Sequence, residues 1–365
     1  MAAFCTTDIR IVSSEKFQQD ILSKTFSGLV LVMTESGEKR WQLESFVQNI
    51  SAETIIRISD VPANPTADDI HATLVKIASA KIDTILTIGG GSAIDLAKGI
   101  SAFYSPEKIL SAEEILENIK TKSYLSSLDI IAVPTTSGTG SEVTQWATVW
   151  DMKNKEKYSI DAPQFKPKNA YIVPEFTLTL PKTLTLSTGL DALAHAMEAY
   201  WSKFTTPLVQ DIAYRSIEII TSVLKSVLEN PSDIKLREKM ARASLLAGLA
   251  FSQTRTTACH AISYPMTMYY GVPHGFAVAL SLAGVADMNK GHFPNDDELF
   301  ALFETWGGIK EWLDYVCEAI VTLKADALGV KDMPMIADKA GGNGRMGNNP
   351  VNLSKEDVLS IIIDI

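Results

Sequence analysis

Short hydrophobic runs alternate with amphipathic stretches over the first half of the chain. The apolar runs are typical of buried strands and lie at 28–33, 84–88, 129–133 and, more weakly, 171–173. Between them, residues 67–80 and 92–103 have the spacing of helices. Strands that alternate with helices predict a parallel sheet with helices on both faces.

The pattern changes after Pro181, where strand signals become scarce. Helical periodicity is predicted over 191–203, 208–228, 234–254 and 274–286. A shorter apolar segment begins at His260, and we expect Pro265 to break it. We therefore predict an α/β domain over residues 1–180 and an all-α domain over residues 181–365.

Composition limits the classes of function. The chain has 365 residues, which is more than one core usually organises, and 46% of them are hydrophobic. A net charge of −10 argues against nucleic acid or an anionic membrane as partners. The N-terminus does not resemble a signal peptide, no apolar run reaches membrane-spanning length, and the three cysteines are irregularly spaced. These features favour a cytoplasmic protein.

Two loops that follow predicted strands are candidates for binding phosphate. The first, Gly89-Gly90-Gly91-Ser92, opens a helix that carries Asp95. The second spans residues 134–142 and is rich in threonine, serine and glycine. Such loops present backbone N–H groups and hydroxyls to a ligand, although each is also explained by a tight turn or a helix cap. Two of them at the ends of strands in one sheet favour a ligand crevice.

One carboxylate and three of the five histidines form a candidate metal site. Asp191 and His195 are four residues apart and share one face of a predicted helix, while His260 and His274 begin the segments that follow. Oxygen and imidazole ligands suit iron or zinc. A single histidine on a helix face is more often a hydrogen-bonded core residue than a ligand, and Asp191 could be an acid in the first turn of a helix. We expect His71 and His292 to be exposed and without a ligand role.

Four stretches together resemble the iron-containing (group III) alcohol dehydrogenase family, in that family's order. They are GGGSAIDLAKGIS (89–101), PTTSGTGSEVT (134–144), GLDALAHAMEAY (189–200) and CHAISYPMTMYYGVPHG (259–275). Asn64-Pro65-Thr66 is similar to a further element of the family, and the resemblance covers most of residues 25–285. It implies a dehydroquinate synthase-like fold, with an N-terminal dinucleotide-binding domain and a helical C-terminal domain.

The resemblance also implies the site residues. The metal ligands would be Asp191, His195, His260 and His274, holding Fe²⁺ or Zn²⁺. The cofactor would contact Asn64, Gly90, Gly91, Ser92, Asp95, Thr135, Thr136, Thr139 and Ser141, with Lys157 near the nicotinamide ribose. A carboxylate at Glu35 would bond the adenosine ribose hydroxyls and repel a 2′-phosphate, so we expect NAD rather than NADP. We also expect a homodimer.

The sequence departs from the family at Tyr264, where many members have a histidine. Tyr264 either relays a proton or simply packs. The region after residue 290 is also shorter than the family pattern.

Arg255 indicates the substrate. It lies in a hydroxyl-rich stretch before His260, and its guanidinium would suit a carboxylate, phosphate or phosphonate unless it forms an internal salt bridge. This stretch resembles the phosphonoacetaldehyde reductase (2-hydroxyethylphosphonate dehydrogenase) branch. The alternatives are a general short-chain alcohol or diol dehydrogenase, an NAD-using lyase or cyclase on the same fold, and a cofactor-binding protein without activity.

Overall fold

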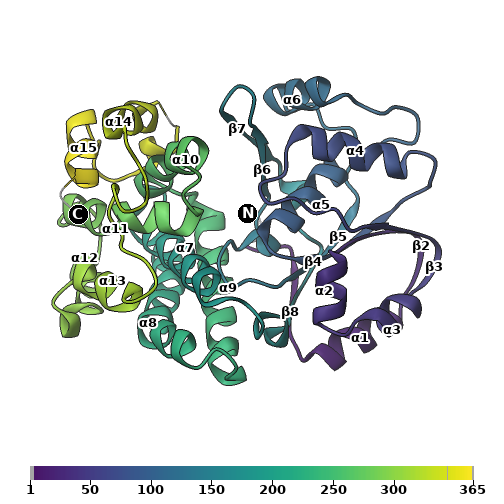
Figure 1. Ribbon diagram of the computed structural model, residues 1–365, viewed down its shortest axis with the longest axis horizontal. Helices are drawn as coiled ribbons and strands as arrows, with labels where there is room; N and C mark the ends of the chain where they lie inside the picture. Colours follow the sequence, from purple (N-terminus) through teal and green to yellow (C-terminus); the bar gives the residue numbers. More distant parts are fainter. Residues whose placement is uncertain (1–3, 343, 364–365) are drawn as a thin grey trace. The chain divides into compact units, whose positions relative to one another are not determined.

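The computed structural model describes residues 4–342 and 344–363 and contains two compact units (Figure 1). The first unit consists of the chain up to Thr136 together with Ser141–Thr179. The second consists of Ser137–Gly140 and the chain from Leu180 onward. Residues 137–140 belong to the predicted loop at 134–142, called the Ser/Thr loop below, and they pack with the helical unit. A single domain boundary at residue 180 does not describe this.

The first unit is built on a six-stranded sheet in the order β1-β8-β5-β4-β2-β3, and every neighbouring pair is parallel. Its strands are β1 (Asp8–Ile11), β2 (Thr25–Val32), β3 (Ser51–Ile58), β4 (Thr84–Gly89), β5 (Asp129–Pro134) and β8 (Asn169–Ile172). Its helices are α1 (Ser14–Leu22), α2 (Glu35–Arg40), α3 (Glu44–Gln48), α4 (Ala67–Ile77), α5 (Gly91–Phe103) and α6 (Ala112–Thr121).

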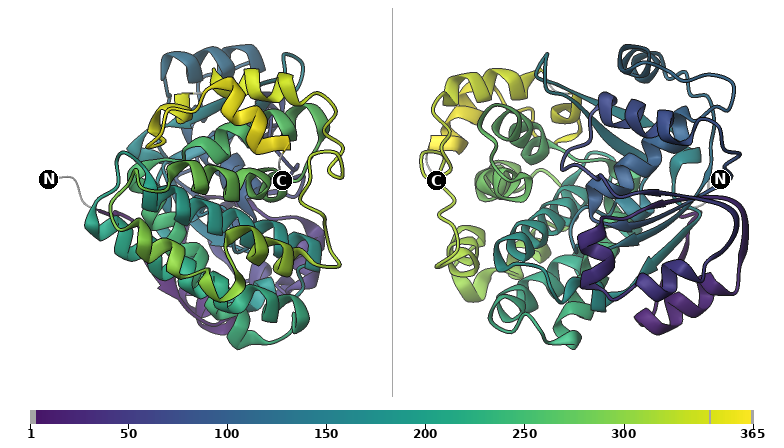
Figure 2. Two further views of the ribbon diagram at one scale, coloured as in Figure 1. Left: turned by 90° about the vertical axis from the view of Figure 1, so that its left-hand side faces the viewer. Right: turned by 45° about the vertical axis from the view of Figure 1, so that its right-hand side comes forward.

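Alternate residues of the buried strands enter two separate cores. In β2, Val30 packs in a cluster with side chains of α4, α5 and α6, whereas Leu31 packs in a cluster with side chains of α1 and α3. Side chains alternate between the two faces of a strand, so a continuous apolar run is needed where both faces are covered. Helices accordingly lie on both faces of this sheet (Figure 2), which confirms the predicted fold class.

Four strands were not predicted, and two of these are the edges of the sheet. The edge strand β3 alternates exposed and half-buried residues, because one of its faces meets solvent and the strand has a single neighbour. Such a strand lacks the continuous apolar run that indicates a central one. The other two form an antiparallel hairpin, β6 (Trp146–Asp151) with β7 (Glu156–Asp161).

The strand order contains a switch point between β2 and β4. The chain leaves β2 to form β3 on one side, whereas it leaves β4 to form β5 on the other. Ligands of doubly wound sheets bind beyond the carboxyl ends of the strands at such a point. The loops predicted to bind phosphate follow β4 and β5, and Glu35 follows β2.

The second unit consists of helices, with α7 covered on almost every face. Its α-helices are α7 (Lys182–Trp201), α8 (Pro207–Glu229), α9 (Ile234–Thr254), α10 (Ala258–Tyr270), α11 (His274–Asn289), α12 (Asp296–Ala301), α13 (Ile309–Cys317), α14 (Met333–Gly341) and α15 (Lys355–Ile363). Among the described residues, no helix has both the length and the apolar character needed to cross a bilayer.

Two expectations about these helices were wrong. Helix α7 begins at Lys182, so Asp191 lies in its middle and is not an acid of the first turn. Helix α10 continues through Pro265 to Tyr270 instead of breaking there. Proline removes one backbone hydrogen bond, and the packing of α10 against α11 and α14 maintains the helix around that gap.

Candidate metal and cofactor sites

Helix α7 places a carboxylate and an imidazole together in the interior. Asp191 and His195 are separated by one turn, and their side chains are only 5% and 7% exposed. The Nδ1 atom of His195 is 3.8 Å from Oδ1 of Asp191. Burying a carboxylate is costly unless it is paired, so its location here indicates a partner of opposite charge.

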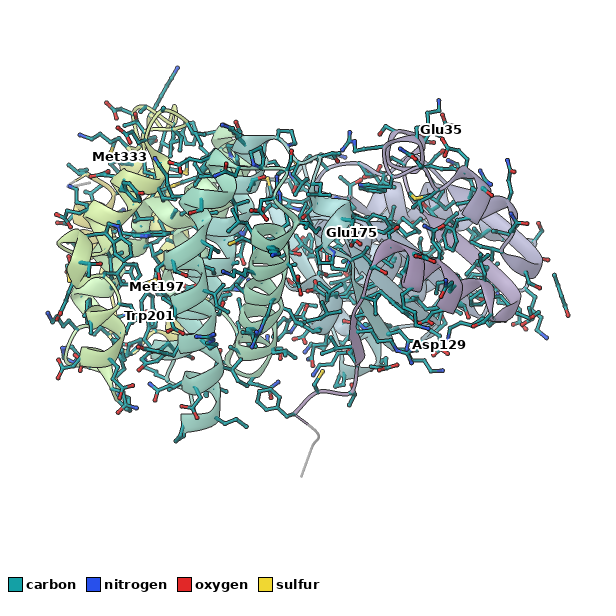
Figure 3. All side chains as sticks on the ribbon, turned by 90° about the horizontal axis from the view of Figure 1, so that it is seen from below. Glu35, Asp129, Glu175, Met197, Trp201 and Met333 are labelled. Carbon is teal, nitrogen blue, oxygen red and sulfur yellow. The ribbon has the colours of Figure 1, made fainter. Side chains whose placement is uncertain are left out.

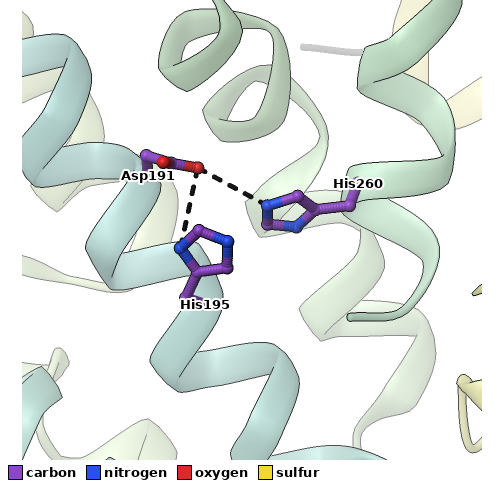
Figure 4. Close-up of side chains that lie close together, drawn as sticks. All are labelled: Asp191, His195 and His260. Carbon is purple, nitrogen blue, oxygen red and sulfur yellow. Dashed lines mark ion pairs between the residues drawn. The ribbon is translucent and has the colours of Figure 1, made fainter. Parts of the chain in front are cut away.

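Two further histidines approach the same carboxylate oxygen from neighbouring helices. The Nε2 atom of His260, on α10, is 3.5 Å from Asp191 Oδ1, and Nε2 of His274, on α11, is 3.8 Å from it. Figure 4 shows His195 on the same helix as Asp191 and His260 facing the carboxylate from another helix. All four residues predicted as metal ligands therefore meet around one oxygen atom.

The arrangement fits a metal ion better than a set of hydrogen bonds. Asp191 Oδ1 and His260 Nε2 are buried and have no hydrogen-bonding partner among the described residues. Donor atoms that share a tetrahedral ion, with bonds of about 2.1 Å, stand roughly 3.4 Å apart. The separations of Asp191 Oδ1 from Nε2 of His260 and of His274, 3.5 and 3.8 Å, are close to this value. Asp191, His195 and His260 each offer one ligand atom within 4.8 Å of the others. A carboxylate with imidazoles suits both iron and zinc.

Glu198 is a functional residue that the sequence analysis missed. Its carboxylate is fully buried; Oε1 accepts the backbone N–H groups of Thr257 at 3.0 Å and Cys259 at 2.8 Å, and Oε2 pairs with Nδ1 of His260. An ionised Glu198 fixes the proton of His260 on Nδ1 and leaves the lone pair of Nε2 facing Asp191. This is the carboxylate–histidine pairing of metal sites. The spacing was a usable signal, because residues 191, 195 and 198 share one helix face.

The Ser/Thr loop supports a second histidine of the cluster, His195. The Nδ1 atom of His195 is 3.3 Å from the carbonyl oxygen of Gly138, and the His195 ring stacks on Phe251 with 4.1 Å between the ring centroids. A Cβ atom at Gly138 would lie 2.7 Å from Cβ of Thr188, so this close approach requires glycine. The loop therefore orients a histidine of the metal cluster, a role that its composition does not reveal.

Burial and mutual charge determine the protonation of Asp191 and His195. Burial lowers the pKa of His195 to about 4, which keeps its imidazole neutral at neutral pH. Burial works against ionisation of Asp191, but the facing imidazoles, His195 first, bring the pKa of its carboxyl well below the usual range. A deprotonated carboxylate beside a neutral imidazole is the state that binds a metal ion.

The candidate cofactor residues of the first unit gather where β3, β4 and β5 end. The backbone N–H of Asn64 donates to Oγ of Ser92 at 3.2 Å, which joins the loop after β3 to the start of α5. Thr135 N–H donates to the carbonyl oxygen of Gly89 at 3.0 Å. Gly90 approaches Thr136 so closely that a Cβ atom would lie 3.3 Å from its methyl group. Gly91 begins α5, whose N-terminus favours an anion.

Asp95 and Ser141 have protein partners inside this unit. Ser141 Oγ donates to Asp95 at 2.8 Å, and Asp95 also accepts the backbone N–H of Thr148 at 3.0 Å. Lys98, fully buried, donates to the carbonyl oxygens of Ser141 and Trp146, both at 2.7 Å. These bonds hold the loop after β5 against α5, so Asp95 and Ser141 shape the candidate phosphate site.

The remaining predicted residues differ in their surroundings. Lys157, on β7, has its amine 5.7 Å from the centroid of the Trp150 ring. Glu35 is exposed at the start of α2 (Figure 3). Thr139 belongs to the segment that packs with the second unit. His292 is exposed as expected, but His71 is half-buried, with Nδ1 2.7 Å from the carbonyl oxygen of Leu110.

Arg255 lies three residues before α10, and Tyr264 lies in the middle of that helix. Arg255 is exposed and has φ 64° and ψ 178°, a conformation that side chains other than glycine rarely adopt. Tyr264 is buried, and its ring stacks on His274 at 5.8 Å between centroids. Burial raises the pKa of Tyr264, so its phenol is neutral. Burial likewise raises the pKa of the Cys259 thiol, which argues against a nucleophilic role.

A fold with this candidate metal cluster defines a class of protein, and comparison with known proteins identifies the same class. The family model described as iron-containing alcohol dehydrogenase matches residues 14–174, and the model for the C-terminal part of that family matches residues 185–365. The chain belongs to the iron-containing alcohol dehydrogenase family. It is an oxidoreductase of the alcohol dehydrogenase class.

Individual relatives span nearly the whole chain. Alcohol dehydrogenase 4 of Schizosaccharomyces pombe is 30% identical, with 91% of this chain and 81% of that protein covered. The 1,3-propanediol dehydrogenase of Citrobacter freundii is 32% identical, with 84% and 82% covered. Among solved structures, sulfoacetaldehyde reductase from Bifidobacterium kashiwanohense, in complex with NAD⁺, has a TM-score of 0.82 at 25% identity, with 98% of this chain and 96% of that chain covered.

Proposed function

We propose that this protein is a metal-dependent, NAD(H)-linked reductase of a short aldehyde that carries an acid group. Its substrate on this proposal is phosphonoacetaldehyde, and its product is 2-hydroxyethylphosphonate. The observation that carries the reaction class is the convergence of Asp191, His195, His260 and His274 on one point in the second unit. Family membership supports the same class.

The residues of the cluster and Glu198 have different roles in the proposed reaction. Asp191 and the three histidines would hold a divalent ion, which would supply Lewis-acid chemistry at the substrate oxygen, and NAD(H) would supply the hydride chemistry. Glu198 keeps the lone pair of His260 on Nε2. The side chains of Asp191, His195 and His260 are at most 7% exposed, whereas that of His274 is 34% exposed. Substrate therefore approaches from the side of His274, and the buried residues exclude water.

The acid group of the substrate is the finer part of the proposal. Arg255 precedes α10 by three residues and maintains a backbone conformation that costs on the order of 1–3 kcal/mol in residues other than glycine. Strain of this size is retained where the surrounding structure requires it, often at a functional site. The similarity to a reductase of sulfoacetaldehyde, another two-carbon aldehyde with an acid group, favours the same substrate class.

The relatives also favour a second candidate, a dehydrogenase of uncharged alcohols or diols. Several are named for such substrates, among them the 1,3-propanediol dehydrogenase and an NADPH-dependent butanol dehydrogenase of Clostridium saccharobutylicum. Family membership does not favour the lyase or cyclase alternative, which predicts no net consumption of NADH.

One experiment decides between these substrates. The purified protein is stripped with a chelator, reloaded with Fe²⁺ or Zn²⁺, and assayed for NADH oxidation with phosphonoacetaldehyde, sulfoacetaldehyde, butanal and lactaldehyde. We expect activity only after reloading, with kcat/KM at least tenfold higher for the acidic aldehydes. Equal or higher values for butanal and lactaldehyde would establish the second candidate, and metal-independent activity would contradict the role of the cluster.

A further inference from the structure

An arginine outside the sequence motifs contacts the ring that stacks on a predicted metal ligand. Arg345 lies in η5 (Gly344–Asn348), and its Cζ atom is 4.9 Å from the centroid of the Tyr264 ring. The Tyr264 ring is parallel to that of His274 within 2°. Two consecutive contacts therefore connect this guanidinium to the exposed side of the metal cluster.

The segment that carries Arg345 is anchored despite its many glycines. Asn348 donates from its side chain to the carbonyl oxygen of Thr256 at 2.9 Å, which ties the segment to the residue after Arg255. Just beyond it, the buried side-chain amides of Asn349 and Asn289 exchange two hydrogen bonds, of 2.8 and 3.0 Å. These bonds anchor the chain just after Arg345, and an arginine on an anchored segment loses less conformational entropy when it binds a ligand.

We propose that Arg345 recognises the acid group of the substrate, with Tyr264 as the platform that positions it beside His274. This inference rests on the proposed function and specifies how that function selects its substrate. A guanidinium binds phosphonate or sulfonate oxygens through paired N–H donors. Contact with an aromatic face stabilises the cation. Arg345 is half-buried, and a partly desolvated position strengthens its attraction for an anion.

The assignment gives Tyr264 a positioning role. A tyrosine ring can stack on His274 with one part of its surface and support a guanidinium with another. Tyr264 thus acts through Arg345 and His274 and need not exchange a proton with substrate. Arg255, whose linker is joined to the Arg345 segment through Thr256 and Asn348, places a second positive charge on the adjoining segment.

The test compares Arg345→Gln and Arg345→Lys with a matched control, Arg242→Gln, which changes an exposed arginine of α9. Binding of methylphosphonate to the metal-loaded protein is measured by calorimetry, and kcat/KM is measured for phosphonoacetaldehyde and butanal. We expect Arg345→Gln to weaken methylphosphonate binding and lower kcat/KM for phosphonoacetaldehyde by about 10- to 100-fold. We expect Arg345→Lys to retain part of the methylphosphonate binding and part of kcat/KM for phosphonoacetaldehyde. In both variants kcat/KM for butanal should change less than threefold, and the control should match wild type.

The outcomes separate this inference from the proposed function. If wild type prefers phosphonoacetaldehyde and Arg345→Gln leaves that preference and methylphosphonate binding unchanged, the role of Arg345 is refuted and the proposed function stands. Equal losses on both aldehydes would also refute it, because they would show that Arg345 only supports packing. If wild type reduces butanal alone, the proposed substrate fails. In that case, methylphosphonate binding that depends on Arg345 would still support an anion site at this residue. If methylphosphonate did not bind at all, both the proposed substrate and the role of Arg345 would be overturned.

Discussion

Glu198 and His260 form a buried pair in which the carboxylate accepts the Nδ1 proton of the imidazole. The pair joins α7 to α10 and turns Nε2 of His260 toward Asp191. Because Oε1 of Glu198 also accepts backbone N–H groups at the start of α10, one side chain fixes both the position of that helix and the tautomer of its histidine. The metal cluster therefore depends on a residue that does not belong to it.

This relationship predicts the effect of Glu198→Gln. A glutamine amide cannot hold the imidazole proton as an ionised carboxylate does, so His260 loses its fixed tautomer. We expect metal affinity to fall by about 10- to 100-fold, as measured by competition with a chromogenic chelator. Glu229→Gln, at an exposed site on α8, is the control. Unchanged affinity in Glu198→Gln would show that the carboxylate only anchors the helix.

Gly138→Ala tests the contribution of the Ser/Thr loop. The added methyl would meet Cβ and the carbonyl oxygen of Thr188 at 2.7 and 2.8 Å, so the loop must shift away from His195. We expect a loss of about 1–3 kcal/mol in the free energy of unfolding and weaker metal binding. Gly341→Ala is the control, since nothing lies within 4 Å of its added Cβ. A Gly138→Ala protein with normal stability and metal content would contradict this account.

Glu35 predicts the choice of dinucleotide. It follows β2 at the switch point of the sheet, where a carboxylate would repel the 2′-phosphate of NADP. We expect Glu35→Ser to lower the ratio of kcat/KM for NADH over NADPH at least tenfold, with Glu44→Ser, an exposed change at the start of α3, leaving it unchanged. If wild type already prefers NADPH, the carboxylate does not select the cofactor.

Glu142 predicts a pH-dependent contribution to stability. Burial raises the pKa of its carboxyl from 4.5 to about 7, although the charge of Lys98 opposes this shift. The folded protein therefore binds more protons than the unfolded chain between these values, and the stabilisation is lost as the pH rises from 4.5 through 7. We expect Glu142→Gln to remove up to about 3 kcal/mol of that dependence.

Urea unfolding at pH 5 and pH 7.5 measures this effect. Wild type should lose stability relative to Glu142→Gln across the interval, and Glu113→Gln, at an exposed position in the first turn of α6, should follow wild type. Parallel profiles for all three proteins would mean that Glu142 titrates normally.

The sequence alone predicted the central architecture. Continuous apolar runs identified β2, β4 and β5, because strands covered on both faces must be apolar throughout. Edge strands such as β3 were not predicted, because half of their residues face solvent and they lack a continuous apolar run. The four candidate metal ligands were expected from motifs, and the structure brings the three histidines among them within 3.8 Å of one oxygen of Asp191, the fourth.

Only the tertiary structure decided what surrounds those ligands. Asp191 and His195 are neighbours by helix geometry, but their meeting with His260 and His274 depends on how α7, α10 and α11 pack. Glu198 behind His260, the carbonyl group of Gly138 beside His195, and Arg345 over Tyr264 join residues that are between 57 and 81 positions apart. Local periodicity specifies which face of a helix is buried, whereas the partner across that face is determined by the packing of the whole unit.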